Sequence, residues 1–235
     1  MISTNFIGRL GNQIFQFAFL FGLHKAKGYD LFLKPNIDLL ECFDLNYPIL
    51  NLNLQIKREP HFYFDKKFPN NYNDNYLYNG YYQSEKYFEH CSNELKNVLK
   101  FRQEHIKNIP EKDLISIHVR RGDYVGNSLH PVISLEYINN AKEKFLNKKF
   151  LVFSDDINWC KKQNLGDYYA ENKNHYIDLY QMTQCSGSII SNSSFSWWGA
   201  YLGINKNVVA PKKWFDGRHK YTNTQDLYCK NWNIL

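Results

Sequence analysis

The sequence lacks the short motifs that identify several large classes of nucleotide- and metal-dependent enzymes. None of its five cysteines forms a C-x-x-C pair, which argues against a zinc site. It contains neither a G-x-G-x-x-G dinucleotide fingerprint nor a G-x-x-x-x-G-K-S/T phosphate loop. A D-x-D triplet, which can hold a divalent metal on a diphosphate, is also missing. The sequence therefore predicts a reaction that uses no metal and no bound cofactor.

Long apolar segments are also scarce. The apolar run from Ile14 to Leu23 is too short to span a bilayer, and it lacks the small-residue cleavage site of a signal peptide. An odd number of cysteines without a secretion signal favours free thiols in a reducing compartment. We expect a soluble, cytoplasmic protein; a peripheral contact with the inner face of the membrane stays open as an alternative.

Hydrophobic and aromatic residues are abundant. The 235 residues are 43% hydrophobic and 17% aromatic, which is enough for one large domain or two small ones. The formal net charge of +6 fits an anionic ligand such as a nucleotide, a nucleic acid or an acidic membrane surface. The lysines are scattered and no nucleic-acid-binding motif occurs, so we do not expect nucleic acid as a partner.

The second half of the chain alternates between short apolar runs and amphipathic segments. This alternation predicts an α/β fold with a parallel, Rossmann-like sheet. Pro110 precedes the first of these runs and suggests a domain boundary, with residues 1–111 before it and 112–235 after it. The expected strands are Leu114–Val119, Phe150–Phe153, Ser188–Ile190 and Val208–Ala210, and the expected helices are Leu135–Leu146, Tyr176–Cys185 and Phe195–Leu202.

The first half is harder to divide. Glycines permit a tight turn at residues 8–13, and the apolar segment after it predicts a buried helix from Ile14 to Lys27 that stops at Gly28. Asparagine, aspartate and tyrosine dominate the stretch from Asn70 to Asn79, which predicts a loop. The remaining expected elements are strands at Phe6-Ile7 and Leu31–Leu33 and a helix from Glu85 to Lys100.

The run His118-Val-Arg120-Arg121-Gly-Asp123 follows a strongly apolar strand. Ligands of open α/β sheets bind just outside the carboxyl ends of the strands. Two adjacent guanidinium groups at such a position suit a phosphate or diphosphate, because their planar forks pair with anionic oxygens. A surface ion pair between Arg121 and Asp123 is the structural alternative.

Three other polar segments flank predicted strands or helices. The Gly8–Gln13 turn precedes the buried helix and serves either tight packing or an anion at the helix N-terminus. The segment from Ser191 to Gly199 offers hydroxyl and N–H donors for a phosphate, or an N-cap followed by two core tryptophans. Asp155 either accepts two hydrogen bonds from an edge such as guanine N1–H and N2–H or caps the next helix.

Taken together, these segments resemble the bacterial α-1,2-fucosyltransferases of glycosyltransferase family 11. The matches run in order through nearly the whole chain and are weakest between Phe32 and Asn79, where we expect acceptor specificity to differ. The matching stretches are Gly8–Ala18, Gly80–Phe88, Ile117–Tyr124, Asp178–Gln184, Asn192–Leu202, Val209–Phe215 and Leu227–Trp232.

The resemblance implies a GT-B-like fold of two Rossmann-like halves, with an acceptor-side half and a C-terminal half that binds GDP-fucose. It implies inverting, metal-independent transfer of L-fucose to the 2-hydroxyl of a galactose-containing oligosaccharide or lipid-linked glycan in surface glycan synthesis. A catalytically silent binder of GDP-sugars or glycans and a fucosyltransferase of another linkage or acceptor are the alternatives.

The resemblance also suggests roles for individual residues. Arg120 is expected to contact the donor diphosphate with support from His118, and Asp123 serves either as the general base or to orient an arginine. Glu85 is a second candidate for the base. The residues expected to bind the donor are Gly11, Asn12, Gln13, Arg121, Asp155, Asn192, Ser193, Ser194, Phe195 and Ser196.

Overall fold

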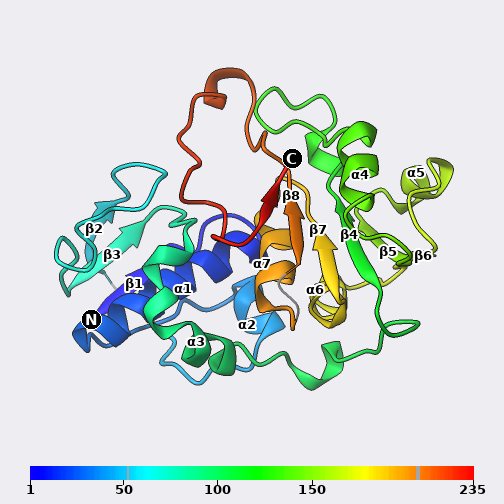
Figure 1. The fold of residues 1–235 in the computed structure, drawn as a ribbon. Helices are drawn as coiled ribbons and strands as arrows, with labels where there is room; N and C mark the ends of the chain where they lie inside the picture. Colours follow the sequence, from blue (N-terminus) through cyan, green and yellow to red (C-terminus); the bar gives the residue numbers. More distant parts are fainter. Residues whose placement is uncertain (52, 205–206) are drawn as a thin grey trace. The chain divides into compact units, whose positions relative to one another are not determined.

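The computed structural model describes residues 1–51, 53–204 and 207–235, which divide into two compact units (Figure 1). The first unit comprises Met1–Gln103 with Asn223–Cys229, and the second comprises Glu104–Thr222 with Lys230–Leu235. The first change of unit falls after Gln103, whereas the sequence suggested a boundary after residue 111. The reason is that the segment after Gln103 packs on the second unit: the His105 ring lies 5.0 Å from that of Tyr176.

The first unit contains a parallel sheet of three strands in the order β1-β3-β2. Its longest helix, α1, buries nearly all of its first four turns, as the predicted buried helix requires, and ends at Gly28 in the left-handed conformation (φ 71°). The elements are β1 (Ile2–Thr4), α1 (Leu10–Lys27), α2 (Asp38–Cys42), β2 (Gln55–Arg58), β3 (Tyr76–Asn79) and α3 (Ser92–Val98), with 3₁₀ turns at Glu85–Tyr87, Glu89–Cys91 and Gln103–His105.

Several predictions for the first half are wrong. The first strand is β1 rather than Phe6-Ile7, because Phe6 adopts a positive φ of 50° that a strand cannot accommodate. Residues 76–79 of the expected loop form β3, the central strand of the sheet. Leu31 and Leu33 make only isolated bridges. The expected helix 85–100 is interrupted at Phe88, whose φ and ψ of −139° and 6° are not helical.

The second unit contains six parallel strands in the order β6-β5-β4-β7-β8-β9. Both units thus have parallel sheets, as predicted. The four strands expected in the second half of the chain are present, and their ends lie within one or two residues of the predicted limits. The elements are β4 (Ile115–Val119), α4 (Leu135–Lys142), β5 (Phe150–Ser154), α5 (Ile157–Lys162), β6 (Tyr168–Tyr169), α6 (His175–Gln184), β7 (Gly187–Ile189), α7 (Ser194–Leu202), β8 (Val208–Ala210) and β9 (Asn233–Ile234), with 3₁₀ turns at Gly122–Tyr124 and Gly217–His219.

The central strand β4 is buried along its whole length and pairs with β5 on one side and β7 on the other. Ile115, Ile117 and Val119 pack into one apolar cluster, whereas Leu151 and Phe153 of β5 belong to a second cluster with Met182 of α6. Apolar side chains therefore cover both faces of the sheet, as in other parallel α/β folds. In register, Val119 pairs with Ser154, so the segments that follow β4 and β5 leave the sheet at the same edge.

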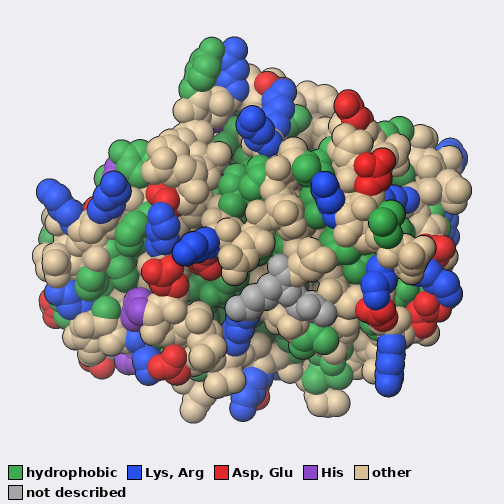
Figure 2. All heavy atoms as spheres, viewed as in Figure 1, with side chains coloured by type: hydrophobic (Ala, Val, Ile, Leu, Met, Phe, Trp, Pro, Cys, Tyr) green, Lys and Arg blue, Asp and Glu red, His purple; other side chains and the backbone are tan. Residues whose placement is uncertain are grey.

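Charged side chains of both signs lie on the surface, and the cysteines are unpaired. Lys, Arg, Asp and Glu side chains are interspersed over the face shown in Figure 2. All five cysteines are free thiols and four of them are buried, which confirms the prediction of unpaired thiols. Across the described residues, no helix combines the length and apolar character needed to cross a membrane.

The packing of α1 yields a test of the first unit. Gly22 lies in this helix, and a Cβ atom built there would lie 2.0 Å from the backbone oxygen of Tyr87. Alanine is the better helix former by about 1 kcal/mol, yet this clash requires the 3₁₀ turn at Glu85–Tyr87 to move. We expect Gly22→Ala to lower the free energy of unfolding by about 1–3 kcal/mol in urea denaturation.

Ala26→Gly in the exposed last turn of the same helix is the matched control. It should lower the stability by about 1 kcal/mol through propensity alone. A Gly22→Ala variant as stable as the wild type or more so would contradict the close contact between α1 and Tyr87.

Candidate active site

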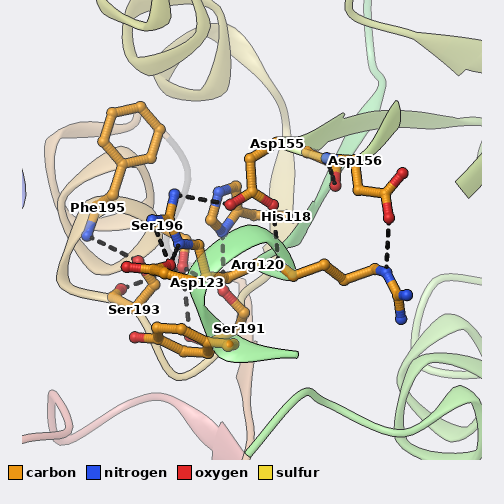
Figure 3. A network of polar contacts seen from close by, with 12 residues as sticks. His118, Arg120, Asp123, Asp155, Asp156, Ser191, Ser193, Phe195 and Ser196 are labelled. Carbon is orange, nitrogen blue, oxygen red and sulfur yellow. Dashed lines mark hydrogen bonds and ion pairs between the residues drawn. The ribbon is translucent and has the colours of Figure 1, made fainter. Parts of the chain in front are cut away.

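Arg120 directly follows the central strand β4 and lies between two carboxylates of the second unit (Figure 3). Its Nε and Nη2 atoms donate hydrogen bonds of 2.9 and 2.5 Å to one oxygen of Asp123, and its Nη1 atom lies 2.9 Å from Oδ2 of Asp155. Only 17% of the Arg120 side chain is exposed. The cation that the sequence singled out for a diphosphate is therefore fixed in position by acidic partners.

Asp155 follows β5 and binds both of the adjacent arginines. Its Oδ1 accepts a 2.8 Å hydrogen bond from the backbone N–H of Arg121, and its Oδ2 pairs with Arg120. Gly122 makes this approach possible, since a Cβ atom there would lie 2.6 Å from Asp155 Oδ2. Asp155 thus joins the ends of β4 and β5; the recognition of guanine expected for it stays a prediction.

The Arg121 side chain contacts a different element from that of Arg120. Its Nε donates a 3.0 Å hydrogen bond to Asp156, and its guanidinium carbon lies 3.9 Å from the centre of the Trp159 ring. Asp156, in turn, caps α5 by accepting from the backbone N–H of Trp159. Arg121 therefore forms an ion pair with Asp156, not the pair with Asp123 that the structural alternative proposed. A contact between Arg121 and the donor stays a prediction.

His118 lies at the end of β4 and connects this strand to the segment after β7. Its Nδ1 lies 2.8 Å from Ser191 Oγ, which is 3.3 Å from Ser196 Oγ (Figure 3). The side chain is only 5% exposed, and burial lowers the pKa of the imidazole to about 4. His118 is therefore neutral at pH 7 and supports the site as a hydrogen-bonding group rather than as a cation.

The N-terminus of α7 lies next to this network. Ser193 caps the helix by accepting from the backbone N–H of Phe195, and Ser196 donates to backbone oxygens of residues 191 and 193. The Phe195 ring lies 5.5 Å from the His118 ring. Ser194 is the first helical residue. Hydroxyl and N–H groups at a helix N-terminus suit a phosphate, and here they belong to the same cluster as the end of β4.

Asn192 is buried and links two loops. Its Nδ2 donates to the backbone oxygens of Pro131 and Trp214, each at 3.0 Å. Its Oδ1 is buried and finds no hydrogen-bond partner within the described part of the chain. Buried polar atoms are normally satisfied by protein, water or ligand. The donor-binding role expected for Asn192 stays a prediction.

The three remaining predicted residues, Gly11, Asn12 and Gln13, belong to the first unit at the start of α1. Asn12 Oδ1 accepts a 2.8 Å hydrogen bond from Gln83. Gln13 donates to Gly8 O and accepts from Leu39 N, both at 3.0 Å, and is thus held at both ends of its amide. These contacts stabilise the turn; the expected role of the three residues in donor binding stays a prediction.

Two aromatic side chains near Arg120 were not identified from the sequence. Tyr124 lies under the guanidinium, with 5.7 Å between Arg120 Cζ and the ring centre, and its hydroxyl donates to Asn192 O. The His130 ring stacks on Tyr124 at a centroid distance of 5.0 Å. Tyr124 was within reach of sequence reasoning because it directly follows Asp123, whereas nothing in the local sequence marks His130.

The site can bind an anion and stabilise growing negative charge. It combines one arginine with N–H and hydroxyl donors at a helix terminus, and such preorganised donors are effective because they do not need to reorganise during reaction. Within residues 1–51, 53–204 and 207–235, no three His, Cys, Asp or Glu side chains are grouped so that they could hold a metal ion.

Several known proteins are similar to this chain in sequence or in fold. The family model described as glycosyl transferase family 11 matches residues 1–235. An α-1,2-colitosyltransferase of Escherichia coli is 30% identical, covering 92% of this chain and 93% of the relative. A galactoside α-(1,2)-fucosyltransferase 2 of Hylobates lar is 24% identical, and the match covers 86% of this chain and 69% of the relative. Among crystal structures, that of NodZ α-1,6-fucosyltransferase soaked with GDP-fucose matches with a TM-score of 0.55 at 14% identity. The match covers 86% of this chain and 91% of NodZ and confirms the GT-B-like fold.

The buried His118 makes stability depend on pH. Its folded-state pKa of about 4 lies below the unfolded value of 6.5, so the unfolded chain binds the proton more readily. This contribution to stability is complete above pH 6.5 and is lost as the pH falls toward 4. Between pH 7 and pH 5 we expect the wild type to lose about 2 kcal/mol more than His118→Gln, as measured by urea unfolding at each pH.

The neutral amide of His118→Gln keeps hydrogen-bonding capacity but cannot titrate, so it serves as the internal reference for other groups. Stability curves that stay parallel for the two proteins over this range would show that His118 is not held neutral by burial.

Proposed function

The chain belongs to glycosyltransferase family 11, a fucosyltransferase family, and from this premise we propose that it transfers L-fucose from GDP-β-L-fucose to the 2-hydroxyl of a galactose-type acceptor. The proposed acceptor is a galactose-containing oligosaccharide or lipid-linked glycan on the cytoplasmic side of the membrane. The α-1,2 linkage is supported by the names of relatives, whose activities are described as α-1,2-colitosyl and galactoside α-(1,2)-fucosyl transfer.

The observation that carries the proposal is the position of Arg120. It lies at the carboxyl end of the central strand and pairs with Asp155. It also lies over the ring of Tyr124, whose hydroxyl donates to Asn192 O just before α7. The donor binds through a diphosphate whose charge increases as the bond to the sugar breaks. A guanidinium and helix N–H groups directed at that charge lower the barrier, since they interact more strongly with the transition state than with the ground state.

In this proposal the residues of the chain replace a metal ion. Arg120 and the donors around Ser193 neutralise the diphosphate, and Asp155 keeps Arg120 in place. The acceptor hydroxyl attacks the anomeric carbon from the face opposite to the leaving GDP, so the β-linked donor gives an α-linked product. Support for metal-independent chemistry comes from Arg120, from the donors at the start of α7 and from the missing D-x-D triplet in the sequence.

A second donor is worth testing because the Escherichia coli relative, which is 30% identical over 92% of this chain, is named a colitosyltransferase. Colitose differs from fucose by the loss of the 3-hydroxyl group. The diphosphate contacts proposed for Arg120 serve either sugar, so they do not discriminate between them. Parallel assays with GDP-fucose and GDP-colitose on one galactoside acceptor would identify the preferred donor.

We expect Arg120→Ala to lower turnover by about 10²–10³-fold, because the growing charge on the β-phosphate loses its principal cation. Arg120→Lys should recover only part of this loss, since an ammonium group cannot pair through a planar fork. The measurement is GDP release from GDP-fucose in EDTA with and without a β-galactoside, and NMR identifies the linkage in the product.

Arg121→Ala is the neighbouring comparison. Because this side chain is anchored to Asp156 and Trp159, we expect its removal to lower thermal stability and to affect turnover less than Arg120→Ala. A comparable loss of turnover at unchanged stability would instead support the donor contact predicted for Arg121. Activity of Arg120→Ala within a few-fold of the wild type would rule out the role proposed for Arg120.

A further inference from the structure

Asp123 occupies the edge of Arg120 that is best suited to bind a phosphate. The Nε and Nη2 atoms form one fork of the guanidinium, and both donate to Asp123 Oδ1 (Figure 3). This fork pairs with two oxygens of a phosphate in the same way as with a carboxylate. The donor diphosphate and Asp123 therefore compete for the same N–H groups.

We propose that the donor diphosphate displaces Asp123 from Arg120, and that the released carboxylate then takes the proton of the acceptor hydroxyl. The inference rests on the function proposed above. It resolves the two alternatives for Asp123, orienting an arginine and acting as a base, into two consecutive states of one side chain.

The two carboxylates around Arg120 differ in how firmly they are held. The side chain of Asp123 is 50% exposed and that of Asp155 25%. Asp155 also accepts from the backbone N–H of Arg121 and lies against Gly122, so it cannot leave Arg120 without breaking a second contact. Asp123 lies in the short 3₁₀ turn Gly122–Tyr124, where its half-exposed side chain can change rotamer more readily than the less exposed Asp155. Asp155 is accordingly the permanent partner of Arg120, and Asp123 is the replaceable one.

Charge balance favours this exchange only when the donor is present. Arg120 carries one positive charge and faces two carboxylates, so a diphosphate must overcome their repulsion to bind. Displacing Asp123 moves one negative charge away from the incoming anion and gives the fork a more highly charged partner. The exchange exposes a carboxylate only while the donor occupies the site, which would make donor binding precede the reaction of the acceptor.

Asp123 lies close to a second titratable side chain, His130. Asp123 is close enough to His130 to raise the pKa of that imidazole, although burial has the larger, opposite effect and lowers it overall. His130 stacks on Tyr124, which itself lies under Arg120. The charged and titratable groups around Asp123 include Arg120, Asp155 on the same guanidinium, and His130, on which His219 also acts.

The transfer step balances with these groups alone. The acceptor oxygen forms a bond to the anomeric carbon of the sugar while its proton moves to a carboxylate oxygen of Asp123. The bond from the anomeric carbon to the β-phosphate oxygen breaks, and its electron pair stays on the phosphate, next to Arg120. Departure of GDP allows Asp123 to lose the proton to water and to pair with Arg120 again.

Asp123→Asn separates this proposal from a purely orienting role. The neutral amide can still accept from Arg120 but repels no phosphate, so GDP should bind roughly 3- to 10-fold more tightly than to the wild type in calorimetry. Turnover should fall by about 10²–10⁴-fold, the usual contribution of a general base. The decrease in turnover that we expect for the wild type at low pH should be smaller in the variant. If Asp123 only orients Arg120, GDP affinity and turnover will both fall, which would overturn the proposal.

Asp113→Asn is the matched control because Asp113 forms an exposed ion pair with Lys148 just before β4, in a left-handed conformation (φ 66°) that asparagine tolerates. It should change neither GDP binding nor turnover. A second variant, Asp123→Ala, should regain transfer when sodium formate supplies a small carboxylate, and the absence of any rescue would count against a base at this position. If the wild type itself neither binds GDP nor transfers fucose, the proposed function fails rather than the role of Asp123.

Discussion

The candidate site depends on one constraint: all strands of the six-stranded sheet run in the same direction. Parallel strands deliver the segments that follow them to a single edge, so the residues after β4, β5 and β7 meet although they are far apart in the sequence. The pairing of Val119 with Ser154 places Arg120 opposite Asp155. An antiparallel β5 would carry Asp155 to the opposite edge and leave Arg120 without its permanent partner.

The electrostatics of the site follow from that arrangement. A single guanidinium faces two carboxylates of unequal exposure, and the neighbouring imidazole of His118 is kept neutral by burial. These groups therefore carry a slight excess of negative charge before a donor binds, and positive potential comes from Arg120 and from the N-terminus of α7. In the mechanism that we propose, a diphosphate binds by displacing Asp123 rather than by attraction to an open positive patch. Donor binding is in this way connected to the chemistry proposed for Asp123.

Prediction from sequence succeeded where local patterns and tertiary environment agree. The strands β4, β5, β7 and β8 are short and largely buried, so their apolar runs were recognisable. It failed where local composition was misleading. Asparagine and aspartate around Tyr76–Asn79 indicate a loop, yet burial of Leu77 and Tyr78 stabilises the central strand of the first unit. The expected helix after Glu85 is interrupted at Phe88, whose ring is completely buried.

Residue order alone was enough to show which chemical groups end the strands: two arginines after β4, two aspartates after β5 and a run of serines after β7. It could not assign their partners. Arg120 and Asp155 are 35 positions apart, and whether Arg121 bonds to Asp123 or to Asp156 depends on how neighbouring strands align. The sequence by itself determines which side chains follow each strand. Ion pairs, burial and the resulting pKa values are decided only by the tertiary structure, because all three depend on distances between segments that are far apart in the sequence.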